Sequence, residues 1–210
     1  MPTEQRESRR AIEGRVRLLD AAEELLDRHG LEGVSARAIS QAAGHRNNAA
    51  VHYHFGTRAE LVEEVLTRRQ VPIDAERHRC IDELEARGDV TLEDLVVALY
   101  QPLMPLMDRA EGRRYLRLMN QAFHHPVFVQ RADLHLSTSV QRVAALAIPL
   151  APHLDEPRLA QRTATLLVVS LSTLAQQAWL RDQDPAPRPV MALDDLLDEL
   201  VRTALALARA

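Results

Sequence analysis

Apolar residues recur every three or four positions along most of this chain, which is the spacing of amphipathic helices. Within residues 11–29, Leu18, Ala22, Leu25 and Leu26 share one face of such a helix. Runs of alternating β-branched residues, which half-buried strands require, are few. Glycine is scarce, with seven in 210 residues, while Ala, Leu and Arg are abundant, and this composition favours helix. The pattern therefore predicts an all-α protein.

Two short helices should follow, over residues 36–43 and 47–54, with a turn between them. Ser35 can cap the first of them with its hydroxyl. Gly44 stands where that helix must end, because glycine accepts the left-handed conformation of a helix C-terminus. Together with the preceding helix, which should close at Gly30, they predict an N-terminal three-helix domain containing a helix-turn-helix. The second helix of such a motif can lie in a DNA major groove.

That second helix carries few large apolar groups. Val51 and Phe55, four residues apart, would anchor it to the core and leave small and polar residues facing outwards. Asparagine side chains match the hydrogen-bonding groups of adenine, and arginine matches those of guanine. The first turn is therefore suited to reading bases, although the two asparagines also fit a plain polar cap. The outward residues are Arg46, Asn47, Asn48, Ala49 and His52.

Caps and breakers also mark the rest of the chain. Thr57 and Glu60 form a capping box for a long helix. Pro72 should kink or break that helix, because proline lacks the N–H and clashes with the preceding turn. A further helical segment then ends at Gly88.

Further helices are expected between Thr91 and the end of the chain, with interruptions at Pro102 and Pro105. Their expected ranges are 92–100, 111–125, 132–150, 156–181 and 192–210. The chain should thus divide into a flexible arm (1–10), a helix-turn-helix domain (11–56), a connecting helix (57–88) and a C-terminal helical bundle (89–210).

Composition narrows the class further. The net charge of −4 does not by itself suggest a nucleic-acid partner, but residues 1–60 are neutral, with nine Arg and nine acidic residues. A local arginine-rich face there can still bind phosphates. The single cysteine, Cys80, allows no internal disulfide and is typical of a reducing compartment. No run of about eighteen apolar residues and no secretory signal are seen, so we expect a cytoplasmic protein that does not span a membrane.

Core, turn and cap residues of the N-terminal part agree, in order and nearly in spacing, with those of a known family. They are the run Leu18 to Leu26, then Gly30, Val34 and Ser35, Ile39, Ala42 to Gly44, Tyr53 to Phe55, and Arg58 to Leu61. On these residues the segment 15–66 resembles the tetracycline-repressor-like (TetR) family of transcription regulators.

The resemblance implies an α-helical homodimer, held through its two C-terminal helices, that represses transcription from a palindromic operator. A small effector bound in the C-terminal domain would release the DNA. By position, Tyr53 would hold a phosphate. The interval from Gly44 to Phe55 is one residue longer than is usual in the family, which leaves open which residue of the first turn reads a base. The expected DNA-contacting residues are Ser35, Arg37, Arg46, Asn47, Asn48, Ala49, His52, Tyr53, Thr57 and Arg58.

An effector pocket is expected where bulky and adaptable side chains gather in the second domain. Met and aromatic residues at helical spacing fit a plain core equally well, so the assignment to a pocket stays open. The ligand would be largely apolar, with a few polar groups to orient it, and no cofactor or metal is expected. The candidate residues are Tyr100, Met104, Met107, Tyr115, Met119, Asn120, Phe123, His124, Thr173, Gln176 and Trp179.

Two other classes compete with this interpretation. An enzyme is disfavoured, because the sequence has no His-Glu-x-x-His, no Glu-x-x-His, no Gly-rich phosphate loop and no Gly-x-Ser-x-Gly. An all-helical interaction module that never binds DNA fits the same packing and is the main alternative. DNA binding that weakens steeply with salt would separate the two, since phosphate contacts release counterions.

Overall fold

The structure, a computed structural model, describes residues 3–45, 49–126 and 137–209. Within these ranges all regular secondary structure is helical, which confirms the expected all-α class. The chain divides into two compact units, Met1–Arg69 and Gln70–Ala210, called unit 1 and unit 2 below. The division falls inside helix α4 (Arg58–Arg87), so the first turns of the expected connecting helix belong to unit 1.

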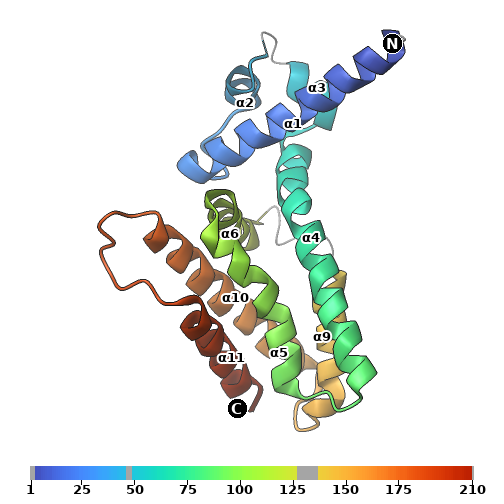
Figure 1. Cartoon of the computed structure of the whole chain (residues 1–210), viewed down its shortest axis with the longest axis vertical. Helices are drawn as coiled ribbons and strands as arrows, with labels where there is room; N and C mark the ends of the chain where they lie inside the picture. Colours follow the sequence, from blue (N-terminus) through green and yellow to red (C-terminus); the bar gives the residue numbers. More distant parts are fainter. Residues whose placement is uncertain (1–2, 46–48, 127–136, 210) are drawn as a thin grey trace. The chain divides into compact units, whose positions relative to one another are not determined.

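Unit 1 contains α1 (Thr3–His29), α2 (Ala36–Ala42), α3 (Ala49–Phe55) and the start of α4, with α1 running across the other three (Figure 1). Helix α1 begins eight residues before the expected start at residue 11. The preceding segment lacks Gly and Pro and is rich in Glu, Gln and Arg. These residues favour helix, and extending a formed helix is far easier than starting one.

The core of unit 1 is drawn from all four helices. Leu18, Ile39, Val51 and Leu61 are fully buried, one from each helix. Around this core, Glu23 of α1 is only 2% exposed and receives hydrogen bonds from two arginines of α4. The polar link fixes α1 against the first turns of α4.

The sequence predicted a kink or a break at Pro72; helix α4 runs unbroken through this residue, so the break is wrong. Proline in a helix interior costs about 3 kcal/mol, and the helix must be held on both sides of it. Leu66 and Ile73 are both buried, in unit 1 and unit 2 respectively. Burial on each side therefore outweighs the local preference. The end of α4 at Gly88, whose φ is +87°, matches the expectation.

Unit 2 is a helical bundle in which α10 packs against α6 and α11, and α5 packs against α9 and α11 (Figure 1). Thr91 caps α5 through a capping box with Asp94. The expected interruption at Pro102 and Pro105 takes the form of a 3-10 helix rather than a loop. The elements are α5 (Leu92–Tyr100), η1 (Gln101–Asp108), α6 (Ala110–His124), α9 (Thr138–Ala147), η2 (Ile148–Leu150), α10 (Glu156–Arg181) and α11 (Leu193–Arg209).

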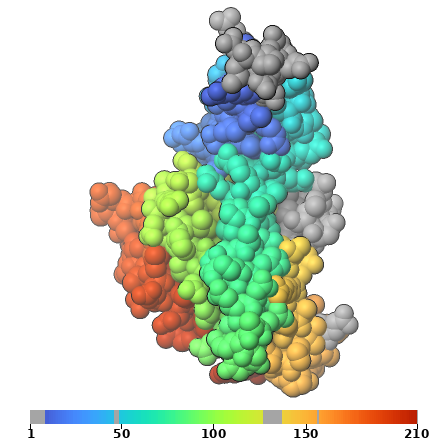
Figure 2. Space-filling view, turned by 45° about the vertical axis from the view of Figure 1, so that its right-hand side comes forward, coloured from blue at the N-terminus to red at the C-terminus, as the bar shows by residue number. Residues whose placement is uncertain are grey.

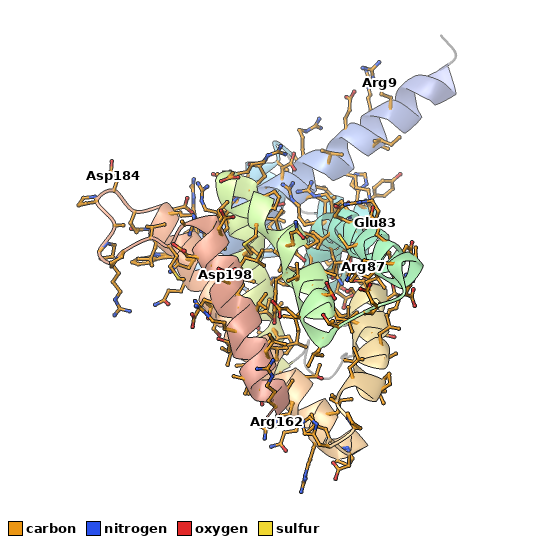
Figure 3. All side chains as sticks on the ribbon, turned by 60° about the horizontal axis from the view of Figure 1, so that its bottom comes forward. Arg9, Glu83, Arg87, Arg162, Asp184 and Asp198 are labelled. Atoms are coloured by element: carbon orange, nitrogen blue, oxygen red, sulfur yellow. The ribbon has the colours of Figure 1, made fainter. Side chains whose placement is uncertain are left out.

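Polar contacts join the second half of α4 to its neighbours in unit 2. Arg142 of α9 forms ion pairs with Asp82 and Glu85 of α4, and the two helices lie side by side on the face shown in Figure 2. Arg87, labelled in Figure 3, binds Asp89 at 2.7 Å and Asp94 at 2.9 Å. These exposed pairs orient α4 more than they stabilise it.

Candidate functional site

The two ends of α2 have the geometry expected of a helix-turn-helix. Ser35 Oγ accepts a hydrogen bond from the N–H of Ala38 at 3.1 Å and so caps α2. At the other end Gly44 has a φ of +78°. The N–H of Gly44 donates to the carbonyl of Gln41, and that of His45 to the carbonyl of Ser40. This pair of bonds is a Schellman motif, which ends a helix firmly at a glycine.

Helix α3 separates an anchoring side from an exposed side. Val51 is fully buried and Phe55 is 9% exposed, as the sequence predicted, whereas Tyr53 is 80% exposed. A tyrosine with most of its ring in water contributes little to the core, so its phenol is available to a partner. Of the expected DNA-contacting residues, those that are exposed are Ser35, Arg37, Ala49, His52, Tyr53 and Thr57; Arg46, Asn47 and Asn48 lie outside the described residues.

His52 is held in one ring orientation by its own helix end. Its Nδ1 lies 2.7 Å from the carbonyl oxygen of Gly56. A carbonyl only accepts, so Nδ1 carries a proton, and Nε2 is the ring nitrogen left for a partner.

Thr57 and Glu60 form the predicted capping box at the start of α4. The Thr57 N–H and hydroxyl both donate to Glu60 Oε2 at 2.7 Å, and the Glu60 N–H donates to Thr57 Oγ1 at 3.1 Å. Arg58 Nε donates to the carbonyl of Val34 at 2.7 Å. Both side chains thus have structural partners within unit 1, and a DNA-contacting role for either stays a prediction.

A second feature of unit 1, a basic cluster behind α3, was not expected from the sequence. The rings of His45 and His54 lie against Gly14 of α1, and Arg15 lies over the Phe55 ring at 4.9 Å from its centroid. Burial, then His45 and Arg15, lower the pKa of His54 below its ordinary value of 6.5. Such contacts arise only when α1 and α3 pack, so no local pattern could have shown them.

Unit 2 contains a largely apolar cavity, part of it open to solvent. It is lined from α4, α5, η1, α6, α9 and α10 by Gln70, Ile73, Arg77, Leu99, Tyr100, Leu103, Tyr115, Leu116, Met119, Ala122, Phe123, Ser137, Val140, Leu167, Ser170, Leu171 and Leu174.

Four of the eleven expected pocket residues line this cavity: Tyr100, Tyr115, Met119 and Phe123. Met104 and Met107 are buried elsewhere in the core, which was the alternative weighed for them. The polar candidates miss it because they fall on other faces of α6 and α10: Asn120 accepts from Ser172, Thr173 bonds back to its own helix, and His124, Gln176 and Trp179 are exposed. The cavity residues contributed by α4 and α9 were not foreseen.

The described part of the chain holds no group of three His, Cys, Asp or Glu side chains arranged to bind a metal ion. None of its helices combines the length and apolar character of a membrane span.

Two family profiles match the chain, one in each unit. Residues 18–65 match the bacterial regulatory proteins of the tetR family, and residues 97–206 match the tetracyclin repressor-like C-terminal domain. The chain belongs to the TetR family. It is therefore a DNA-binding transcriptional regulator, and the resemblance seen in residues 15–66 is confirmed and extends to the second domain.

Solved structures agree with this fold. A TetR-family transcriptional regulator from Mesorhizobium loti is 15% identical with a TM-score of 0.55, and the match covers 95% of this chain and 97% of that one. A transcriptional regulator from a Rhodococcus species is 23% identical with a TM-score of 0.52, covering 91% and 96%. At these identities the likeness concerns the fold alone. No curated protein matches the sequence.

Proposed function

We propose that this TetR-family regulator is a repressor that binds a palindromic operator as a homodimer and leaves it when a small, largely apolar ligand occupies the cavity of unit 2. The observation that carries the proposal is the exposed side of α3. Tyr53 and His52 stand on it, while Val51 and Phe55 anchor the helix from behind. In a helix-turn-helix this is the helix that enters the major groove.

The proposed DNA contacts divide by chemistry. The Tyr53 hydroxyl can donate to a phosphate, which positions the protein without reading sequence. In the sequence, Arg46, Asn47 and Asn48 directly precede Ala49, and their side chains match bases: arginine matches guanine, and asparagine matches adenine. Because the turn is one residue longer than usual, only an experiment assigns a base to each.

The test is selection of binding sites from random duplex DNA with the purified full-length protein. We expect an inverted repeat whose half-sites lie on one face of the duplex. Arg46→Ala should then weaken binding to the selected site by about tenfold or more, the loss of one good base or phosphate contact. Arg202→Ala is the matched control, since Arg202 is an exposed arginine of α11 paired only with Glu199 among the described residues. No enriched sequence at low ionic strength would contradict DNA binding by this chain.

Dimerisation is proposed through α10. The apolar stripe of α11 is mostly used inside the protomer, because Leu196 and Leu200 are buried. On α10, by contrast, exposed residues recur at helical spacing and leave a stripe of small and apolar groups. They are Thr165, Val168, Val169, Ser172, Gln176 and Trp179. Small residues let two such helices approach closely about a two-fold axis.

Light scattering after size exclusion tests the dimer. Val169→Asp should shift the protein from dimer to monomer at micromolar concentration, since an unpaired carboxylate in an apolar interface is costly. Val190→Asp, at a similarly exposed valine outside the helices, should leave the dimer intact. Equal behaviour of the two variants would place the interface elsewhere.

Ligand and DNA are proposed to communicate through α4. This helix begins at Arg58, directly after Thr57, and its Gln70, Ile73 and Arg77 line the cavity. If ligand and operator prefer different arrangements of α4, each must weaken the binding of the other by the same factor. Measuring the affinity for the operator with and without a ligand that binds the cavity tests the coupling, and an unchanged affinity for DNA would contradict it.

A further inference from the structure

The cavity of unit 2 contains one fully charged side chain that its apolar surroundings do not explain. Arg77 lines the cavity from α4 and is 9% exposed. Arginine remains protonated even where burial lowers its pKa, as it does here. A buried charge is costly unless it is paired. The partners of Arg77 therefore decide what the cavity is suited to hold.

Within the described part of the chain, Arg77 lacks a paired anion. Its side chain makes one hydrogen bond there, from Nε to the carbonyl of Leu99 at 2.9 Å. That bond fixes the plane of the guanidinium and leaves the two terminal nitrogens, with four N–H donors, for another acceptor. Gln70, Ile73 and Arg77 are spaced to share one face of α4, and all three line the cavity.

The nearest carboxylate that influences Arg77 is already occupied. Asp74, one turn before Arg77, accepts hydrogen bonds from the N–H of Ser139 at 3.2 Å and the hydroxyl of Thr138 at 2.9 Å, and one from the hydroxyl of Ser139. These donors lower the pKa of Asp74 against the opposing effect of burial. Asp74 thus caps α9 and forms no ion pair with Arg77, since no described carboxylate lies within 4.0 Å of that guanidinium.

Two tyrosines complete a polar spot in the apolar wall. Tyr115 is 4% exposed, and its hydroxyl has no hydrogen-bond partner among the described residues. Burial raises the pKa of Tyr115 and the charge of Arg77 opposes that rise, which places the two groups in electrostatic contact. Tyr100 binds the Ser170 hydroxyl at 2.6 Å. An N–H fork and an unused phenol O–H are both donors, so the missing partner is an acceptor.

We infer that the cavity binds an amphipathic organic acid, with its carboxylate on Arg77 and Tyr115 and its apolar body against Leu103, Leu116, Met119 and Phe123. The inference rests on the proposed role of this cavity as the effector site. A carboxylate matches the guanidinium fork with two parallel hydrogen bonds. Arg77 is the only charged residue among the described residues that line the cavity, so it balances a single negative charge, which favours a carboxylate over a phosphate dianion.

The experiment compares ligands that differ only in the head group. Calorimetric titration of the full-length protein at pH 7.5 would use decanoate, decan-1-ol, decylamine and decyl phosphate as probes. We expect decanoate to bind about tenfold or more tightly than decan-1-ol, as for one charge-assisted pair, and decylamine to bind least. The alcohol is the more hydrophobic probe, so general partition into an apolar cavity would give the opposite order.

Arg77→Met supplies the decisive variant, because it keeps the length of the side chain and removes its charge. Decanoate and decan-1-ol should then bind within about threefold of each other. Tyr115→Phe, which preserves the ring, should weaken decanoate several-fold and leave decan-1-ol unchanged; it remains informative if Arg77→Met does not fold. Far-UV circular dichroism of each variant checks folding.

Three results would overturn the inference. They are equal binding of decanoate and decan-1-ol by the wild type, a preference for decanoate that survives in Arg77→Met, and tighter binding of decyl phosphate than of decanoate. None of these measurements involves DNA. If the protein prefers decanoate through Arg77 but binds no duplex, the acid-binding inference stands and the proposed effector role of the cavity fails. If the protein binds its operator but prefers decan-1-ol, the acid-binding inference fails and the proposed regulatory function stands.

Discussion

The buried carboxylate of Glu23 offers the sharpest test of how unit 1 is held together. Glu23 Oε2 accepts from Arg68 Nη2 at 2.6 Å and from Arg69 Nε at 3.2 Å, and Oε1 accepts from Arg69 Nη2 at 3.1 Å. The glutamate is 2% exposed, while the two arginine side chains are 26% and 32% exposed. Glu23→Ala therefore leaves two half-buried arginine side chains without the carboxylate that they share.

The magnitude follows from this asymmetry. Removing one partner of a buried ion pair costs about 3–5 kcal/mol, because the remaining charge loses its compensation. Here both arginine side chains can rotate towards solvent, and Arg68 keeps its ion pair with Asp20 at 2.8 Å. We therefore expect Glu23→Ala to lower the free energy of unfolding by the lower end of that range, about 3 kcal/mol. Glu24→Ala is the matched control, because Glu24, the neighbour of Glu23, forms an exposed ion pair with Arg28. Such a pair contributes about 0.2–1 kcal/mol at most.

Urea unfolding followed by two signals measures the effect. Far-UV circular dichroism reports on all helices, whereas the only tryptophan, Trp179, lies in unit 2. Glu23→Ala should lower the urea midpoint seen by dichroism more than the midpoint seen by fluorescence. It should also weaken DNA binding more at 37 °C than at 15 °C. If Glu23→Ala and Glu24→Ala differ by less than about 1 kcal/mol, the ion pair does not hold α1 against α4.

Three further predictions concern stability. Burial and neighbouring basic groups lower the pKa of His54 in the folded protein, so as the pH falls the unfolded chain binds a proton on His54 before the folded protein does. The contribution of His54 to the free energy of unfolding is therefore present above pH 6.5 and should decrease as the pH falls through that value. The urea midpoint should show this decrease, and His54→Gln should flatten it. Gly14→Ala should raise the free energy of unfolding by about 0.5–1 kcal/mol, since its new Cβ would meet nothing nearer than 3.5 Å. Gly112→Ala would instead place Cβ 2.3 Å from a backbone oxygen and should cost about 1–3 kcal/mol. Thermal melts of both variants measure these changes. Tyr100→Phe should cost about 1–2 kcal/mol because it leaves the buried Ser170 hydroxyl unpaired. Burial raises the pKa of Tyr100 to about 12, so Tyr100→Phe should remove no phenolate absorbance near pH 10 relative to the wild type.

Features that depend on a few neighbouring residues were determined by the sequence alone. Ser35 caps α2, Gly44 ends it, and Thr57 with Glu60 starts α4, each as predicted. A cap is a contact between residues three or four apart, so its energy is decided before distant parts of the chain meet. The same locality explains why Val51 and Phe55 could be placed in the core of unit 1.

Features that depend on competition between local and distant forces needed the tertiary structure. Pro72 opposes a helix, yet burial on both sides of it keeps α4 continuous. The sequence likewise placed polar ligand groups on α6 and α10, where the packed helices turn Asn120 and Gln176 away from the cavity. Arg77, 22 residues from the Leu99 carbonyl that orients it, carries no sequence signature at all. Its burial without a described counter-charge exists only because helices from distant parts of the chain close around one space, and an electrostatic environment of that kind is a property of the packed bundle.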